Sequence, residues 1–138
     1  VLAYWKEHSS PFDVGYGLHV LTDAQWVPRF RQRFPQLLNA EGKINTAVYY
    51  NDNYVTDFQL YADGGRELLE LTAHGVAPEN HPLLTKAEFD QWRALVEELY
   101  RGACPKHDPV QCFDRAYAEA FIEECQPMLD DVWRRFQE

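Results

Sequence analysis

The sequence predicts a single α+β domain, in which an antiparallel β-meander of three to four strands packs against two C-terminal antiparallel helices. Three observations carry this prediction. Apolar residues alternate with polar ones in the middle of the chain, a helix-capping motif precedes the last third, and glycine and proline punctuate both regions. The 138 residues suffice for one hydrophobic core and contain no repeat or linker, so we expect one domain over 1–138.

The first forty residues predict a short strand and then a short N-terminal helix. Residues 16–21 form a β-prone run, and Thr22 or Asp23 can cap the helix that follows. Proline is tolerated in the first turn of a helix but not in its interior. The helix is therefore expected to begin as late as Pro28 and to end near Pro35.

Residues 43–73 carry the strand signal. Every second residue of 44–50 and of 54–60 is apolar, aromatic or β-branched, which is typical of strands. Three polar residues between the two runs predict a hairpin turn: Asn51, Asp52 and Asn53. Glycines at 64 and 65 can adopt the positive φ of a second tight turn, so residues 66–73 are expected to return as a third strand.

A capping box predicts the first of the two C-terminal helices. Thr85 and Glu88 have the spacing in which each side chain bonds the other's backbone N–H, and Gly102 is placed to end the helix. The apolar residues between them follow helical spacing and are expected to face the core: Phe89, Trp92, Val96 and Leu99.

The second helix is expected to open at Asp108 and Pro109, a capping residue followed by a proline in the first helical position. Its apolar stripe runs to Phe136. Pro127 lies inside this stripe and predicts a kink or a split.

Three cysteines allow at most one disulfide. If Cys112 and Cys125 share the second helix, about 20 Å of helical rise separates them, which is beyond disulfide reach. Cys104 precedes that helix, so Cys104 and Cys112 are the candidate pair. Three buried thiols are the alternative. No Cys-x-x-Cys pair occurs, and no metal site is expected.

Charge bears on the class of partner. The net charge is −9, with 13 basic against 22 acidic residues, which would repel nucleic-acid phosphates and attract a basic protein. No apolar run approaches the roughly 18 residues that span a bilayer, so no membrane span is expected. Because the chain opens at Val1 without methionine, we expect a processed periplasmic or secreted protein, with the cytoplasm as the alternative.

Motifs for chemistry are missing from the sequence. It contains no Gly-x-Ser-x-Gly elbow, no phosphate-binding glycine loop and no metal-binding histidine spacing, so no catalytic residue and no cofactor are expected. The segment 51–57 resembles a calcium loop only in being polar, because the glycine and the final glutamate of that loop are absent.

The predicted hairpin combines tyrosine and asparagine, the residue types favoured on protein-recognition surfaces. These residues are the predicted partner-binding site: Tyr50, Asn51, Asp52, Asn53, Tyr54, Asp57 and Tyr61. Ordinary strand tyrosines are the alternative interpretation.

The functional prediction follows from size, acidity and the lack of chemistry. We expect a small acidic inhibitor that occludes the active site of a basic enzyme or toxin, by analogy with bacterial immunity proteins. Two alternatives are an enzyme of an unfamiliar kind, using His and Asp/Glu residues of the 52–74 region, and an accessory subunit of a complex.

Overall fold

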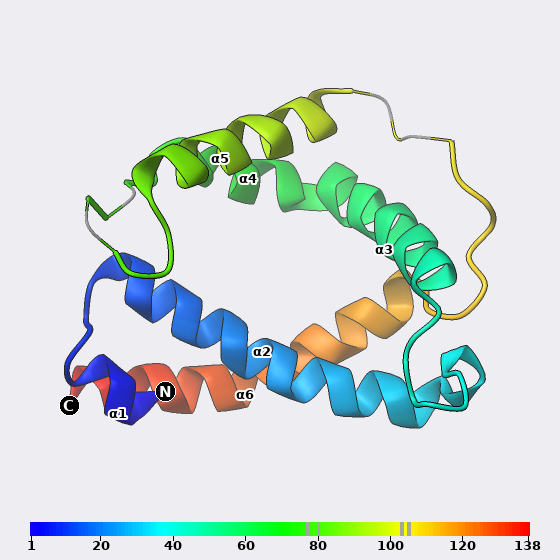
Figure 1. Ribbon diagram of the computed structural model, residues 1–138, viewed down its shortest axis with the longest axis horizontal. Helices are drawn as coiled ribbons and strands as arrows, with labels where there is room; N and C mark the ends of the chain where they lie inside the picture. The colour runs from blue at the N-terminus through cyan, green and yellow to red at the C-terminus, as the bar shows by residue number, and fades with distance from the viewer. Residues whose placement is uncertain (77, 80, 103, 105) are drawn as a thin grey trace. The chain divides into compact units, whose positions relative to one another are not determined.

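The structure is a computed structural model that describes residues 1–76, 78–79, 81–102, 104 and 106–138. Across these ranges the regular structure is helical, and β pairing is limited to isolated bridges, Leu38 with Ile44 and His81 with Leu84. The predicted α+β fold with an antiparallel meander is therefore wrong. The chain has an all-α fold (Figure 1).

The helices follow one another as α1 (Leu2–Trp5), α2 (Pro11–Arg33), the 3-10 helix η1 (Pro35–Leu37), α3 (Thr46–Leu60), the π-helical turn η2 (Tyr61–Gly65), α4 (Arg66–Thr72), α5 (Lys86–Arg101) and α6 (Arg115–Gln137). They form two compact units. Unit 1 contains Val1–Tyr49 and Ala116–Glu138, and unit 2 contains Tyr50–Arg115. One domain over 1–138 stays a prediction.

Helix α2 begins much earlier than the sequence pattern predicted. Ser10 is its N-cap and accepts a hydrogen bond of 3.2 Å from the backbone N–H of Asp13, and Pro11 occupies the first helical position. These local signals start a helix that includes residues 16–21. The strand predicted there is wrong.

The end of α2 agrees with the prediction. The helix stops just before Pro35, and its last turn closes with a 2.9 Å hydrogen bond from the N–H of Phe34 to the carbonyl of Phe30. Pro28 lies inside the helix rather than at its start. Packing of the surrounding aromatic residues outweighs the lost backbone hydrogen bond.

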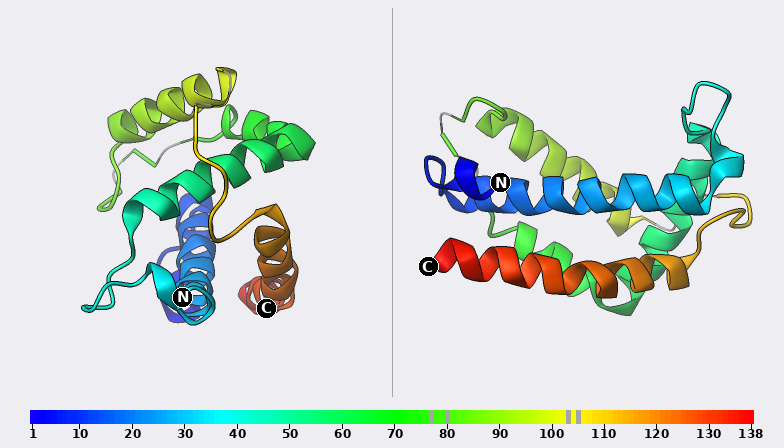
Figure 2. Two further views of the ribbon diagram at one scale, coloured as in Figure 1. Left: turned by 90° about the vertical axis from the view of Figure 1, so that its right-hand side faces the viewer. Right: turned by 90° about the horizontal axis from the view of Figure 1, so that it is seen from below.

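Aromatic side chains build the core of unit 1. The ring of Phe30 is fully buried and lies 5.8 Å from the ring of Trp26 and 5.1 Å from that of Phe34. From α6, Tyr117 and Phe121 contribute rings 5.5 and 4.9 Å from Trp26, in T-shaped arrangements. Helices α2 and α6 consequently run side by side in opposite directions (Figure 2).

Helix α1 is fixed to α2 by one buried tryptophan. The indole N–H of Trp5 donates a 3.0 Å hydrogen bond to the carbonyl of Asp13, and its ring lies 5.0 Å from Phe136 of α6. A Cβ added to Gly17 would lie only 2.5 Å from the Trp5 Nε1 atom. The missing side chain at Gly17 therefore makes room for the indole.

Helix α3 replaces the predicted hairpin. Its buried residues are Asp52, Val55 and Thr56, which have the three- and four-residue spacing of a helix face. Two of these three buried residues are polar, so the buried side of α3 cannot be recognised from the spacing of apolar residues. The alternation of apolar and polar residues across 44–50 and 54–60 therefore predicted strands, and that prediction is wrong.

The turn after α3 confirms the prediction of positive φ at one of the two glycines. Gly64 has φ of 118°, a value that favours glycine, whereas Gly65 has φ of −59°. Residues 66–73 do not return as a strand, since α4 covers nearly all of them.

The first C-terminal helix, α5, follows its predicted bounds. The Thr85 hydroxyl accepts from the N–H of Glu88 at 3.2 Å, and the Glu88 carboxylate accepts from the N–H of Thr85 at 2.9 Å, so the capping box is confirmed. Gly102 is the first residue after the helix, as predicted. Neither α4 nor α5 contains a fully buried residue.

Helix α6 begins later than predicted, at Arg115 instead of Asp108. The N–H groups of residues 111–113, which a helix would have used in its first turns, donate instead to a carboxylate of α3. Pro127 is accommodated within one continuous helix that bends in its middle (Figure 1). Across the described ranges, no helix is both long enough and apolar enough to cross a bilayer.

Candidate functional site

The residues predicted to bind a partner lie on α3 and η2. Helical spacing places five of them on one face: Tyr50, Asn53, Tyr54, Asp57 and Tyr61. The two tyrosines near the start of this face are 55% and 46% exposed at positions 50 and 54. Their role in partner binding stays a prediction, now on a helix face rather than on a hairpin tip.

Asp52 points away from that face and is 0% exposed. Its carboxylate accepts hydrogen bonds from the backbone N–H groups of Gln111, Cys112 and Phe113, at 3.0, 2.8 and 3.1 Å. The expectation of a solvated Asp52 at a hairpin tip is wrong. A buried carboxylate needs this many donors, because desolvation of an unpaired charge is costly.

Asn51, the residue before Asp52, binds the same segment at Asp108, which precedes the partners of Asp52. Its amide oxygen accepts from the N–H of Asp108 at 2.9 Å, and its amide nitrogen donates to the Asp108 carbonyl at 3.2 Å and to the Asp52 carboxylate at 3.1 Å. We call Asn51 and Asp52 the α3 clamp. It ties residues 108–113 to α3, so these two predicted binding residues have a structural role.

Asp57 and Tyr61 connect α3 and η2 with α5. The Tyr100 hydroxyl donates to the Asp57 carboxylate at 2.8 Å, and the ring of Tyr61 stacks on that of Tyr100 at 4.6 Å. Burial, and then the hydrogen bond to Asp57, raises the pKa of Tyr100. The hydroxyl therefore remains protonated and keeps donating throughout the physiological range.

Cys104 is exposed and Cys125 is buried, and both are free thiols in this structure. The disulfide of Cys104 with Cys112 stays a prediction for the oxidised protein. Its supporting argument needs correction, because Cys112 precedes α6 and does not share a helix with Cys125.

Helix α5 presents the feature that the sequence analysis missed. Trp92 and Leu95 are 54% and 59% exposed, although Trp92 was expected to face the core. The apolar stripe of α5 is wider than the surface that the rest of unit 2 covers. Along the exposed side, Glu88 lies four residues before Trp92 and Glu98 three residues after Leu95. We call these four residues the α5 face.

The basic residues of α5 already have acidic partners on the same helix. Lys86 pairs with Asp90, Arg93 lies 3.5 Å from the same carboxylate, and Arg101 lies 3.6 Å from Glu97. In the part of the chain that the structure describes, neither carboxylate of the α5 face has a basic partner. The α5 face is thus apolar in its middle and negative at both ends.

The carboxylate of Glu88 also belongs to the capping box. Hydrogen bonds from the backbone N–H and the hydroxyl of Thr85 lower the pKa of Glu88. Glu88 therefore stays charged at neutral pH.

The remaining polar clusters carry no metal-site geometry. Within the described ranges, no group of three His, Cys, Asp or Glu side chains is placed to hold a metal ion. His74 is exposed after α4, whereas both carboxylate oxygens of Asp52 accept hydrogen bonds from backbone N–H groups.

No protein family, curated protein sequence or solved structure matches this chain.

Proposed function

We propose that this chain is a non-enzymatic binding protein that captures a basic protein through the α5 face. The observation that carries the proposal is the exposure of Trp92 beside Leu95, between two carboxylates without basic partners. Tryptophan is among the residues most enriched in binding hot spots.

Burial supplies the driving force for binding. Full burial of a large apolar side chain contributes about 1.5–3 kcal/mol. Trp92 and Leu95 each retain more than half of their surface for a partner. The pair therefore offers enough apolar surface to anchor a partner.

Charge selects the kind of partner. Unit 2 contains twelve acidic and six basic residues, so it carries −6 of the net charge of −9. A second copy of this chain would meet the same negative charge and be repelled. A cationic partner would instead be steered toward unit 2.

The order of residues along the α5 face suits an amphipathic helix as the partner. Apolar side chains of the partner helix would contact Trp92 and Leu95, while lysine or arginine one turn away on either side would pair with Glu88 and Glu98. If the helix lies at the mouth of an enzyme active site, capture occludes the site. We therefore propose that binding through the α5 face inhibits a basic enzyme or toxin.

The experiment uses a synthetic amphipathic helix of leucine and lysine, and a scrambled peptide of the same composition. Calorimetry measures Kd for the wild type, for Trp92→Ala, and for Tyr54→Ala as a matched change on the exposed α3 face. The measurement is repeated from about 0.05 to about 0.5 M salt.

We expect the amphipathic peptide to bind more tightly than the scrambled one, and more weakly as salt rises. Trp92→Ala should weaken binding by about tenfold or more, and Tyr54→Ala by less than about twofold. Equal affinity for both peptides would contradict the proposal. A large loss in Tyr54→Ala with none in Trp92→Ala would move the binding surface to α3.

A further inference from the structure

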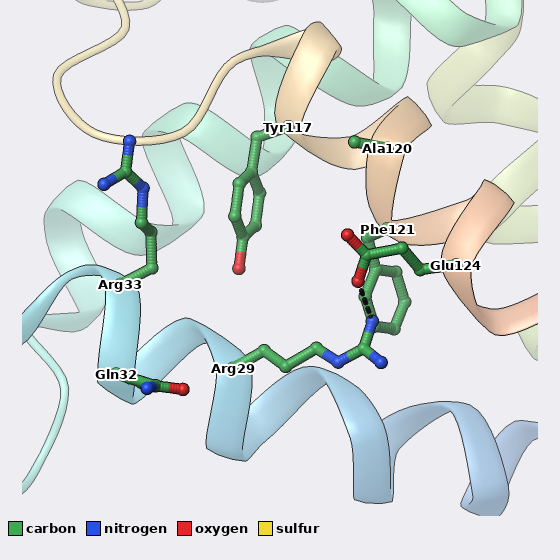
Figure 3. A pocket seen from close by; sticks show the side chains of 7 residues that line it. All are labelled: Arg29, Gln32, Arg33, Tyr117, Ala120, Phe121 and Glu124. Carbon is green, nitrogen blue, oxygen red and sulfur yellow. Dashed lines mark hydrogen bonds and ion pairs between the residues drawn. The ribbon is translucent and has the colours of Figure 1, made fainter.

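A groove runs between α2 and α6 in unit 1 and has a volume of about 480 Å³. Six side chains give it its chemistry (Figure 3): Arg29, Gln32, Arg33, Tyr117, Phe121 and Glu124. This volume falls in the range of small-molecule pockets. In a chain of net charge −9, two arginines in one groove call for an explanation.

One end of the groove is closed by an internal ion pair. The Arg29 guanidinium donates to the Glu124 carboxylate at 2.5 Å and lies 5.7 Å above the centre of the Phe121 ring. Both charges are thereby neutralised by each other. Arg29 is held in place and is not the cation that a ligand would meet first.

The other end of the groove offers hydrogen-bond donors. Arg33 has no acidic partner and Gln32 has no hydrogen bond among the residues that the structure describes. The Tyr117 ring extends from α6 toward α2, between Arg33 and the ion pair (Figure 3). Burial raises the pKa of the Tyr117 hydroxyl, which therefore stays protonated near neutral pH.

The wall between these ends is apolar and rigid. Phe121 is buried, Ala120 lies beside it in the groove, and both come from α6. The Phe121 ring packs edge-on against Trp26 at 4.9 Å, and the Tyr117 ring lies 5.0 Å from Phe34. Since these rings belong to the core of unit 1, the wall is formed before any ligand arrives.

We propose that this groove binds a small carboxylic acid with an aromatic ring. The carboxylate would accept two parallel hydrogen bonds from the Arg33 guanidinium and further ones from Gln32, and the ring would lie against Tyr117 and Ala120. A single unpaired arginine suits a monoanion. Phosphate, with its higher charge, would need a second cation, and Arg29 is already paired with Glu124.

The test uses 2-naphthoate as the probe, with 2-naphthylmethanol as its neutral counterpart and inorganic phosphate as the competing anion. Titrations followed by NMR give Kd for the full chain, for Arg33→Gln and for Arg31→Gln. Arg31 is the matched control, because it is an exposed arginine on the same helix outside the groove. Circular dichroism establishes that each variant is folded.

We expect 2-naphthoate to bind with a Kd of about 1 mM or tighter and to shift the side-chain signals of Gln32 and Arg33. Arg33→Gln should weaken binding by about tenfold or more, and Arg31→Gln by less than about twofold. No binding of 2-naphthoate, equal binding of the neutral alcohol, tighter binding of phosphate, or equal losses in the two variants would each overturn the proposal.

Discussion

Unit 1 and unit 2 are stabilised in different ways. Of the nine apolar residues buried in the described part of the chain, seven belong to unit 1 and only Val55 and Phe113 to unit 2. Unit 2 also buries the polar residues Asp52 and Thr56, and unit 1 buries Asp13. Unit 1 therefore has an aromatic core, whereas in unit 2 the hydrogen bonds of the α3 clamp tie residues 108–113 to α3.

This difference decides which apolar surface remains available. In unit 1 the aromatic residues at the centre of α2 and α6 contact one another, and Phe30, Phe34 and Phe121 are buried there. In unit 2 the amphipathic helix α5 has no fully buried residue, and Trp92 and Leu95 face solvent. A thin core and an exposed apolar helix face are the properties expected of a unit that completes its packing on a partner.

The largest expected effect contrasts a core ring with an exposed one. Phe30→Ala should lower the free energy of unfolding by about 3–5 kcal/mol, because it empties the centre of the aromatic core. Trp92→Ala should lower it by less than about 1 kcal/mol, since more than half of that side chain is exposed. Urea unfolding followed by circular dichroism measures both, and similar losses would erase the contrast between the units.

The next effect tests whether polar contacts organise unit 2. Asp52→Ala should lower the free energy of unfolding by about 2–4 kcal/mol, because three backbone N–H groups lose their acceptor. Asn53→Ala, on the exposed side of the same helix, is the control and should be nearly neutral. Hydrogen exchange at the Phe113 amide should accelerate in Asp52→Ala, and unchanged exchange there would show that the clamp is dispensable.

A smaller effect tests close packing in unit 1. Gly17→Ala would bring a methyl group within 2.5 Å of Trp5 Nε1 and should cost about 1–3 kcal/mol. Gly15→Ala, two residues earlier in α2, meets nothing within 4 Å and should stabilise the helix by about 0.5–1 kcal/mol. Thermal unfolding distinguishes the two signs, and a neutral Gly17→Ala would mean that Trp5 moves freely.

The smallest effect concerns pH and α5. Because the pKa of Glu88 is lower in the folded protein than its ordinary value of 4.5, its contribution to stability is present above that value. The contribution is lost as the pH falls through the lower folded value. Glu88→Gln keeps a hydrogen-bonding side chain without titrating there, so its stability should fall less on acidification. Identical acid profiles for the two proteins would argue against this role.

The sequence revealed local structure better than the fold. The Thr85 capping box, the end of α2 before Pro35 and the positive φ of Gly64 depend on neighbouring residues only, and each was predicted correctly. The signal for the start of α2 is also present in the sequence, in Ser10, Pro11 and Asp13, but the β-prone run that follows it masks the helix.

The errors arose where tertiary contacts decide. A buried carboxylate and a buried threonine on α3 disguised its helical period, and no local pattern shows that the partners of Asp52 lie about sixty residues away. The same applies to α5. Its spacing predicted an apolar stripe correctly, but how much of that stripe the rest of the protein covers depends on the folded chain.

The most direct test of the proposed function observes Trp92 itself. It is the single tryptophan of unit 2, while Trp5, Trp26 and Trp133 belong to unit 1, so the four indole N–H signals in an NMR spectrum report on both units at once. Trp92→Phe assigns its signal. On titration with the amphipathic leucine–lysine peptide, we expect the Trp92 signal to move and the buried Trp5 signal to stay in place. A stationary Trp92 signal with bound peptide would contradict the assignment of the α5 face as the binding surface.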